Sequence, residues 1–214
     1  GDANVNSGFD IVGDANTLAH NLADGNSGDG FVISGSRNKL QIDNIATNNG
    51  DDGFQVNGGN NKLIHNSSND NADKGFVVDG DDNKLTHNLA DGNSGDGFVV
   101  GGRKNKLTND TAINNHVDGF FTEGDQNRLQ TNSAQNNGDE GFDIESNFNM
   151  LRGNSATGNT SNGITVSLGF AHNTVAGNRA TGNSTPDLSD ENGSCVSNTW
   201  RGNHFGTKDP ACIR

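Results

Sequence analysis

Apolar residues recur along this chain at a fixed interval of 22 residues, with a single step of 23. The dipeptide Gly-Phe marks the interval most clearly, and it begins at Gly8, Gly30, Gly53, Gly75, Gly97, Gly119 and Gly141, with Gly163-Ile164 as a variant eighth copy. A Leu and then a small residue, mostly Ala, follow at constant distances. Self-similarity at a period of about 20 to 50 residues is typical of repeat architectures, so the pattern indicates one structural unit used many times.

Each unit predicts three short β-strands joined by turns. One unit reads G-F-x-[VI]-x-G-x-x-N-K-L-x-x-N-x-A-x-x-N-x-x-D, in which Phe and Val stand two residues apart. A period of two belongs to a strand, and no segment has the 3.6-residue period of a helix. A single unit cannot bury its apolar side chains, whereas stacked units would place Phe over Phe and Leu over Leu. We therefore predict an all-β parallel solenoid of about 8–9 rungs, with 22 residues per rung.

Three columns of Asn keep step with the apolar residues. Asn tolerates the left-handed backbone conformations found at turns. An amide stacked on an identical amide one rung away can also donate to one neighbour and accept from the other. We interpret the Asn columns as turn and ladder residues that have a structural role.

The units G-F-x-V…N-x-L-x-x-N-x-A resemble the repeats of the right-handed parallel β-helix superfamily, in the branch of bacterial secreted repeat proteins that includes NosD-like and pectate-lyase-like chains. The tail, with Cys195 to Trp200 and Pro210 to Ile213, is similar to the ending of many such chains. The resemblance covers about Gly8 to Ile213 and implies a right-handed parallel β-helix. It leaves the activity open, because this repeat occurs in lyases, hydrolases, epimerases and proteins without known activity.

Composition narrows the classes of function. The chain has 37 Asn and 31 Gly, only 29% hydrophobic residues and a formal charge of −13, so an ordinary globular core is out of reach and a narrow stacked core is needed. The negative charge argues against a nucleic-acid partner, and no apolar run is long enough to span a membrane. The chain has no Tyr, which counts against epimerase and many lyase chemistries of this superfamily.

The two ends of the chain predict different things. We expect residues 1–183 to form the repeat domain and residues 184–214 an irregular last rung with a C-terminal cap. The only two cysteines, Cys195 and Cys212, bracket that rung, and a disulfide would contribute on the order of 3 kcal/mol; two free thiols are the alternative. A bridge would indicate a secreted protein. At Gly1 the sequence enters part-way through a unit, so we expect a preceding domain, a stacking partner or nothing to cover the first rung.

The position after each Phe should point to solvent. There we expect an exposed apolar strip of Val77, Val99 and Phe121, beside the acids Glu123, Asp143 and Glu145. Carboxylates next to an aromatic ring could supply the acid and base of glycoside hydrolysis, or bind Ca²⁺ weakly. The alternative is that an acidic protein simply shows acids on its surface, since no Lys or Arg lies in this strip to bind an anionic sugar.

Two charged columns run along the repeat. The Lys column follows the first Asn of five consecutive units and comprises Lys39, Lys62, Lys84, Lys106 and Arg128. Stacked like charges repel, and a bound polyanion would relieve the repulsion; the alternative is that the cations prevent aggregation and balance nearby acids. The acid column precedes Gly and comprises Asp29, Asp52, Asp96, Asp118 and Glu140. It could gather divalent cations weakly, although Asp before Gly is ordinary turn chemistry.

These observations predict an extracellular β-helix module that needs no cofactor and has a structural or polysaccharide-recognition role. The alternative is a polysaccharide-degrading enzyme, a glycoside hydrolase or lyase acting on an acidic glycan, with Glu123, Asp143 and Glu145 as its catalytic residues. An enzyme of this fold should carry inserted loops that wall a cleft, and the units here hardly vary in length.

Overall fold

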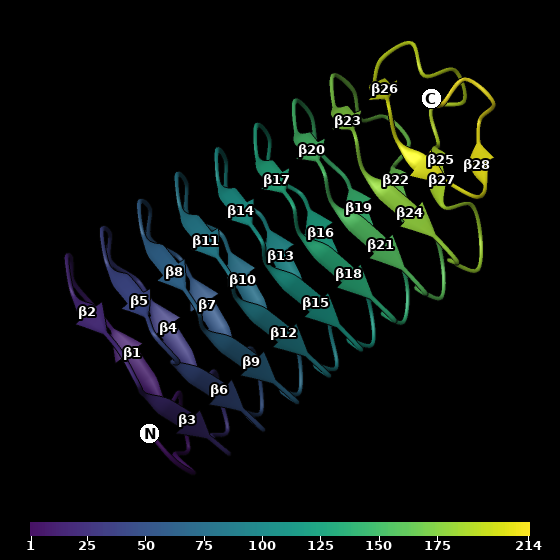
Figure 1. The fold of residues 1–214 in the computed structure, drawn as a ribbon. Helices are drawn as coiled ribbons and strands as arrows, with labels where there is room; N and C mark the ends of the chain where they lie inside the picture. Colours follow the sequence, from purple (N-terminus) through teal and green to yellow (C-terminus); the bar gives the residue numbers. More distant parts are fainter.

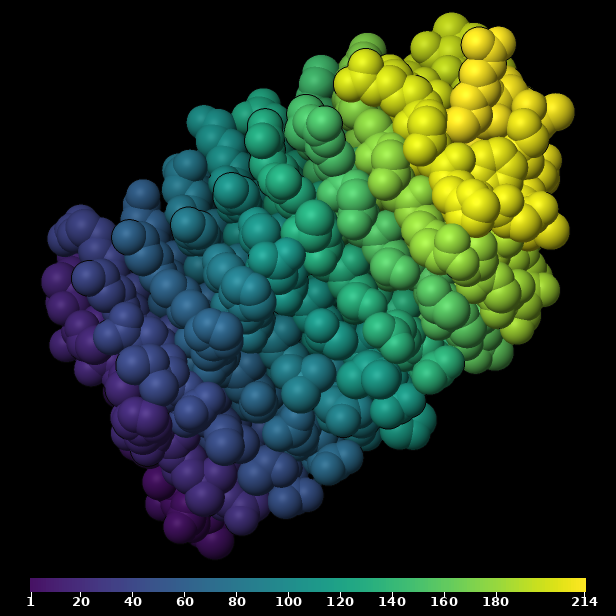
Figure 2. All heavy atoms as spheres, in the orientation of Figure 1, coloured from purple at the N-terminus to yellow at the C-terminus, as the bar shows by residue number.

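A computed structural model describes all 214 residues as one column of stacked rungs (Figure 1). Every regular element is a short strand, and three parallel sheets run along the column, so that each full rung contributes one strand to each sheet. The chain termini lie at opposite ends, and the rungs cross the surface in Figure 2 as successive bands of colour. No helix is long and apolar enough to cross a membrane. The predicted parallel solenoid is confirmed.

The three sheets are named here after their characteristic residues. The Phe sheet has ten strands, in the order β1 (Phe9–Ile11), β4 (Phe31–Ile33), β7 (Phe54–Val56), β10 (Phe76–Val78), β13 (Phe98–Val100), β16 (Phe120–Thr122), β19 (Phe142–Ile144), β22 (Ile164–Val166), β25 (Leu188–Asp190) and β28 (Lys208–Asp209). The Lys sheet has nine, in the order β2 (Thr17–Leu18), β5 (Lys39–Gln41), β8 (Lys62–Ile64), β11 (Lys84–Thr86), β14 (Lys106–Thr108), β17 (Arg128–Gln130), β20 (Met150–Arg152), β23 (Thr174–Ala176) and β26 (Thr199–Arg201). The Ala sheet also has nine, in the order β3 (Leu22–Asp24), β6 (Ile45–Thr47), β9 (Ser67–Asn69), β12 (Leu89–Asp91), β15 (Thr111–Ile113), β18 (Ser133–Gln135), β21 (Ser155–Thr157), β24 (Arg179–Thr181) and β27 (His204–Phe205).

The core is a set of stacked columns of identical side chains. The rings from Phe9 to Phe142 stack with centroids 4.7–4.8 Å apart and planes inclined by only 3–5°. A column of Ile and Val from the Phe sheet, a column of Leu from the Lys sheet and a column of Ala from the Ala sheet complete the core. Phe31 is fully buried, whereas Phe9 on the first rung is only partly buried. Because each unit buries its apolar residues against the next, a chain poor in them still has a continuous core.

Close packing explains why Gly precedes each Phe. A Cβ atom built on Gly97 would lie 2.7 Å from the Cβ of Ala112 and 2.7 Å from the carbonyl oxygen of Gly119 on the next rung. Both separations are shorter than packed atoms tolerate. The Gly-Phe dipeptide and the Ala column therefore depend on each other.

The Asn columns form three buried hydrogen-bonded ladders. The backbone N–H and the Nδ2 group of Asn71 both donate to Oδ1 of Asn93, at 3.1 and 2.9 Å. In the column that begins at Asn16, most amides donate instead to a glycine carbonyl, as Asn83 Nδ2 does to Gly80 at 2.8 Å.

The ladder Asn residues themselves do not adopt the left-handed conformation. Positive φ angles belong to the residue before each ladder Asn, such as His87 (φ 57°) before Asn88. That residue turns the corner, so that the Asn after it directs its side chain into the rung.

The last rung, at the C-terminal end of the column, departs from the regular repeat. Cys195 and Cys212 form the predicted disulfide, with their Cα atoms 6.1 Å apart. Trp200 takes the place of Leu in the core, pairs with Val175, and donates from Nε1 to Oδ2 of buried Asp190 at 2.8 Å. This bond satisfies the buried indole N–H of Trp200, while Asp190 also accepts from the backbone N–H and the Nδ2 group of Asn192 at 3.2 and 2.9 Å.

Candidate functional site

The Lys column is continuous along the outer face of the Lys sheet. Lys39, Lys62, Lys84, Lys106 and Arg128 occupy the first position of five neighbouring strands and pair one on one. None of them makes an ion pair; the four ion pairs of the protein involve Gly1, Arg37, Lys74 and Arg103. Because neighbouring strands lie about 4.8 Å apart, the surface presents a regular row of unpaired positive charges. Direct pairing with nearby acids does not balance it.

The outer face of the Phe sheet differs from the sequence prediction. Val77 and Val99 are only 8% and 6% exposed, so the expected exposed apolar strip is wrong. Val77 lies between Gln55 and Val99, and Val99 lies between Val77 and the larger Phe121. Side chains in one outward column therefore cover each other, and only Phe121 keeps appreciable exposure.

Four of the predicted site residues do lie together near β16 and β19. Phe121 pairs with Asp143 on the next rung, while Glu123 and Glu145 are exposed and follow these two strands. The Ser167 hydroxyl donates to Asp143 Oδ1 at 2.8 Å. Burial raises the pKa of Asp143 to about 6, and the nearby charges of Glu145 and Glu191 add to the effect. The group therefore contains a carboxyl that titrates near neutral pH.

The acid column borders the same face. Asp118 accepts the backbone N–H of Glu140 at 2.8 Å, and Asp96 accepts that of Asp118 at 2.9 Å. Burial raises the pKa of Asp118, and the charges of Asp96, Glu140 and Asp143 raise it further. The acid column thus forms hydrogen bonds from one rung to the next, and it makes this face strongly negative.

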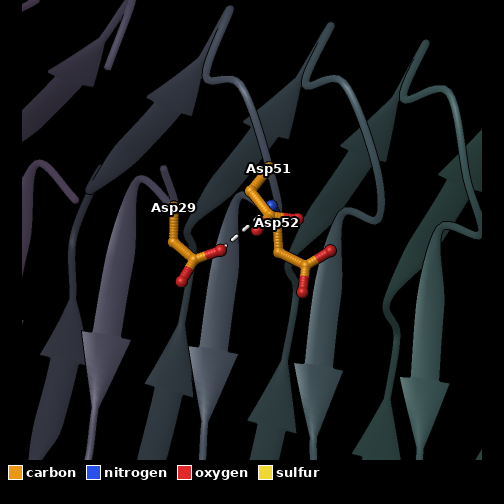
Figure 3. A group of neighbouring side chains, drawn as sticks. All are labelled: Asp29, Asp51 and Asp52. Carbon is orange, nitrogen blue, oxygen red and sulfur yellow. Dashed lines mark hydrogen bonds between the residues drawn. The ribbon is translucent and has the colours of Figure 1, made fainter. Parts of the chain in front are cut away.

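Two groups of three carboxylates could hold a divalent cation. One comprises Asp29, Asp51 and Asp52, shown in Figure 3, and the other Asp118, Asp139 and Glu140; within each group the nearest oxygens lie within 4.8 Å of one another. In the first group Asp29 Oδ1 already accepts the backbone N–H of Asp52 at 3.1 Å. A set made only of oxygen ligands suits Ca²⁺ better than Zn²⁺, and weak Ca²⁺ binding stays a prediction.

The sequence reasoning missed a second group of cations on the Lys sheet. Arg152 of β20 and Arg201 of β26 flank Ala176 of β23 in the third position of the strands. With Gly177 and Gly202 they line a shallow pocket of about 310 Å³, which we call the Arg pocket. The signal was hidden because these arginines lie in the last rungs, where the steps between equivalent residues are 24 and 25 instead of 22.

Comparison with known proteins identifies a family and several similar folds. The family described as the right handed beta helix region matches residues 3–112 and 96–180. The A-module of mannuronan C-5 epimerase AlgE4 from Azotobacter vinelandii superposes with a TM-score of 0.65 at 18% identity, over 86% of this chain and 60% of that one. A double mutant of the periplasmic alginate epimerase AlgG gives 0.57 at 16% identity, over 87% of this chain and 50% of that one.

These structural matches show the fold alone, because the sequence identities are low. This chain spans 60% of the AlgE4 module and half of AlgG. No curated protein matches the chain in sequence.

Proposed function

We propose that this chain, which belongs to the right-handed β-helix family, is a recognition module whose Lys sheet binds a linear anionic polysaccharide without turning it over. One observation carries the proposal. The five cations of the Lys column lie on consecutive rungs without an ion pair, in a protein of formal charge −13.

A polyanion is the partner that this surface would favour. Like charges on neighbouring strands repel, so the unliganded column is mildly unfavourable. A linear chain with an anionic group at each step would neutralise several of these charges at once, and its approach would be steered by their summed field. A single small anion would relieve the repulsion at only one or two rungs. The regular spacing therefore favours a polymer.

The fold comparisons support the choice of the first ligands to test. AlgE4 is a mannuronan C-5 epimerase and AlgG an alginate epimerase, so this fold accommodates proteins that act on polysaccharides. We also propose a location outside the cytoplasm, because disulfides persist in oxidising compartments and Cys195 is bonded to Cys212.

The binding proposal is tested with alginate and pectin by isothermal titration calorimetry. We expect binding that weakens steeply between low and physiological salt, because exposed charges are screened. Changing Lys62, Lys84 and Lys106 together to Gln should abolish most of it, whereas Glu123→Gln on the Phe sheet should leave it intact. Binding that survives the triple change would contradict the proposal.

The second candidate is a polysaccharide-degrading enzyme with Glu123, Asp143 and Glu145. The raised pKa of Asp143, about 6, favours it, because a proton donor must be protonated near working pH. The absence of a cation in this column argues against an acidic substrate there. We expect neither unsaturated products nor new reducing ends from pectin, alginate or neutral glucans. Products that disappear in Asp143→Asn or Glu145→Gln would establish the enzyme instead.

A further inference from the structure

The type of cation on the Lys sheet changes along the column. Strands β5, β8, β11 and β14 carry Lys at their first position, whereas the cations of β17, β20 and β26 are all Arg. In β20 the first position is Met150, and the charge moves to the third position at Arg152. The row of charges therefore steps across the sheet and ends at the Arg pocket.

Small residues create the Arg pocket. The corner residue between the Lys and Ala sheets is Gly only in the last three rungs, at Gly153, Gly177 and Gly202. In the preceding rungs that corner is filled by the larger residues His65, His87, Asn109 and Thr131. Ala176 likewise replaces the longer side chains found at its position in earlier strands. The result is a hollow of about 310 Å³ with an arginine at either side.

Both arginines are available to a ligand. Arg152 and Arg201 are exposed, and neither takes part in any of the ion pairs of the protein. Their backbones are two strand spacings apart, about 9.6 Å, with only Ala176 between them. A guanidinium group offers a planar fork of donors that matches a carboxylate or a sulfate, whereas a Lys ammonium acts as a point charge.

We propose that the Arg pocket binds one carboxylate or sulfate group of an anionic polysaccharide and fixes the position of that chain on the Lys sheet. This inference rests on the proposed function, and it divides the surface into two parts. The Lys column attracts any polyanion without regard to register, and the Arg pocket anchors one group by directed hydrogen bonds. From β5 to β26 the path covers seven strand spacings, about 34 Å, so chains long enough to reach both parts should bind best.

The test compares defined oligomers of polygalacturonate, which carry carboxylates only, with heparin oligomers, which also carry sulfates. Affinities are measured at low salt for the unmodified protein and for the double variant Arg152→Gln/Arg201→Gln. A second variant, Arg152→Lys/Arg201→Lys, keeps the charge and removes the fork. The matched control, Arg37→Gln/Arg103→Gln, removes two exposed arginines that pair with Asp14 and Asp125.

We expect the double Gln variant to bind long oligomers about tenfold more weakly and the double Lys variant to recover only part of that loss. The control should change affinity by less than about twofold, and short oligomers held by the Lys column alone should not distinguish the variants. If the double Gln variant loses affinity for heparin only, the pocket binds sulfate. If it loses affinity for both ligands, the pocket binds carboxylate as well. An equal loss of affinity in the control variant, or full affinity in the double Lys variant, would overturn the proposal that the Arg pocket anchors the ligand.

The two proposals fail separately. If the triple Lys change weakens binding while the double Gln change does not, the Arg pocket is wrong and the binding surface stands. If neither ligand binds the unmodified protein, the proposed function is wrong, and so is the binding role proposed for the Arg pocket. A direct readout is the Nε–H signal of Arg152 and Arg201 in nuclear magnetic resonance spectra, which should shift with a long oligomer while that of Arg37 stays in place.

Discussion

The outer faces of the Phe sheet and the Lys sheet share one backbone repeat and differ in what their side chains do. On the Phe sheet, outward residues such as Val99 are almost buried, and the acid column beside them accepts backbone N–H groups from the next rung. On the Lys sheet, the outward cations are exposed or half-buried and make no ion pair. The outward residues of the Phe sheet pack within the fold, whereas the outward cations of the Lys sheet have no ion-pair partner in the protein.

The difference shows that acidic and basic side chains can have different roles on two faces of one regular repeat. A carboxylate such as Asp118 that accepts a backbone N–H takes part in the fold, and because burial and nearby acids raise its pKa, folding disfavours its charged form. A Lys that extends into water contributes little to folding. We therefore expect substitutions on the two faces to separate stability from binding.

The largest expected effect concerns the core that both faces cover. Phe76→Ala should lower the free energy of unfolding by about 3–5 kcal/mol. Val77→Ala, on the outer side of the Phe sheet, should cost about 1–2 kcal/mol, because Val77 is 8% exposed. Ile64→Ala, on the outer side of the Lys sheet, should cost less than either, since Ile64 is only half-buried. Denaturant melts measure the free energy of unfolding of all three variants. Equal losses for Val77→Ala and Ile64→Ala would show that the outer faces of the two sheets do not differ in packing.

The second prediction uses the raised pKa values of the acids. Asp110 has a pKa of about 7, raised by burial, and Asp52 and Asp143 have values of about 6, also raised mainly by burial. The folded state therefore holds these protons more tightly than the unfolded state, where the pKa is near 4. Stability should be highest near pH 4 and fall by several kcal/mol as the pH rises through 6–7. If thermal melts show that stability increases with pH across this range, the raised pKa values are wrong.

A third prediction isolates one of these acids. Asp110 stands where the ladder has Asn in the neighbouring rungs; it is fully buried and accepts from Asn88 at 2.7 and 2.9 Å and from the Thr108 N–H at 2.9 Å. Asp110→Asn should stabilise the protein by about 2 kcal/mol at pH 8, with the gain vanishing near pH 4. The reciprocal change Asn132→Asp should destabilise it with the same pH dependence. Equal stability of the two variants at pH 8 would show that charge in this ladder is harmless.

The smallest effects separate the two charged columns. Asp96→Ala removes the acceptor of the Asp118 N–H and should cost about 1 kcal/mol, measured at pH 5, where repulsion among the acids is weaker. Lys84→Ala should change stability by less than about 0.5 kcal/mol while weakening polyanion binding. A large loss of stability from Lys84→Ala would mean that the Lys column, too, belongs to the structure.

Most of the fold follows from the repeat in the sequence. A constant interval of 22 residues fixes which residues lie above each other, so the Phe stack, the Asn ladders and the pairing of the Lys column could be predicted from their positions alone. The two cysteines could be paired because the chain has no others.

The rest depends on how rungs pack. Val77 and Val99 are almost buried because outward side chains on neighbouring rungs cover one another, which strand alternation does not express. The charge of Asp143, 25 positions later in the chain, raises the pKa of Asp118. The repeat pattern does not reveal that these two side chains lie close together. Arg152 and Arg201 were missed because the steps from Arg152 to Ala176 and from Ala176 to Arg201 are 24 and 25 residues, so the 22-residue interval does not align them.

The ladders also make the length of the molecule adjustable. Each ladder bond runs from one rung to the next in the same direction, as from Asn71 to Asn93 and from Asn93 to Asn115, so a unit of 22 residues can be inserted or removed with all bonds remade at the new junction. The stretches His20 to Val32 and His87 to Val99 are identical, as duplication of whole units would leave them. The length of the Lys sheet can then change in increments of about 4.8 Å, and with it the extent of the surface that we propose to bind a polyanion.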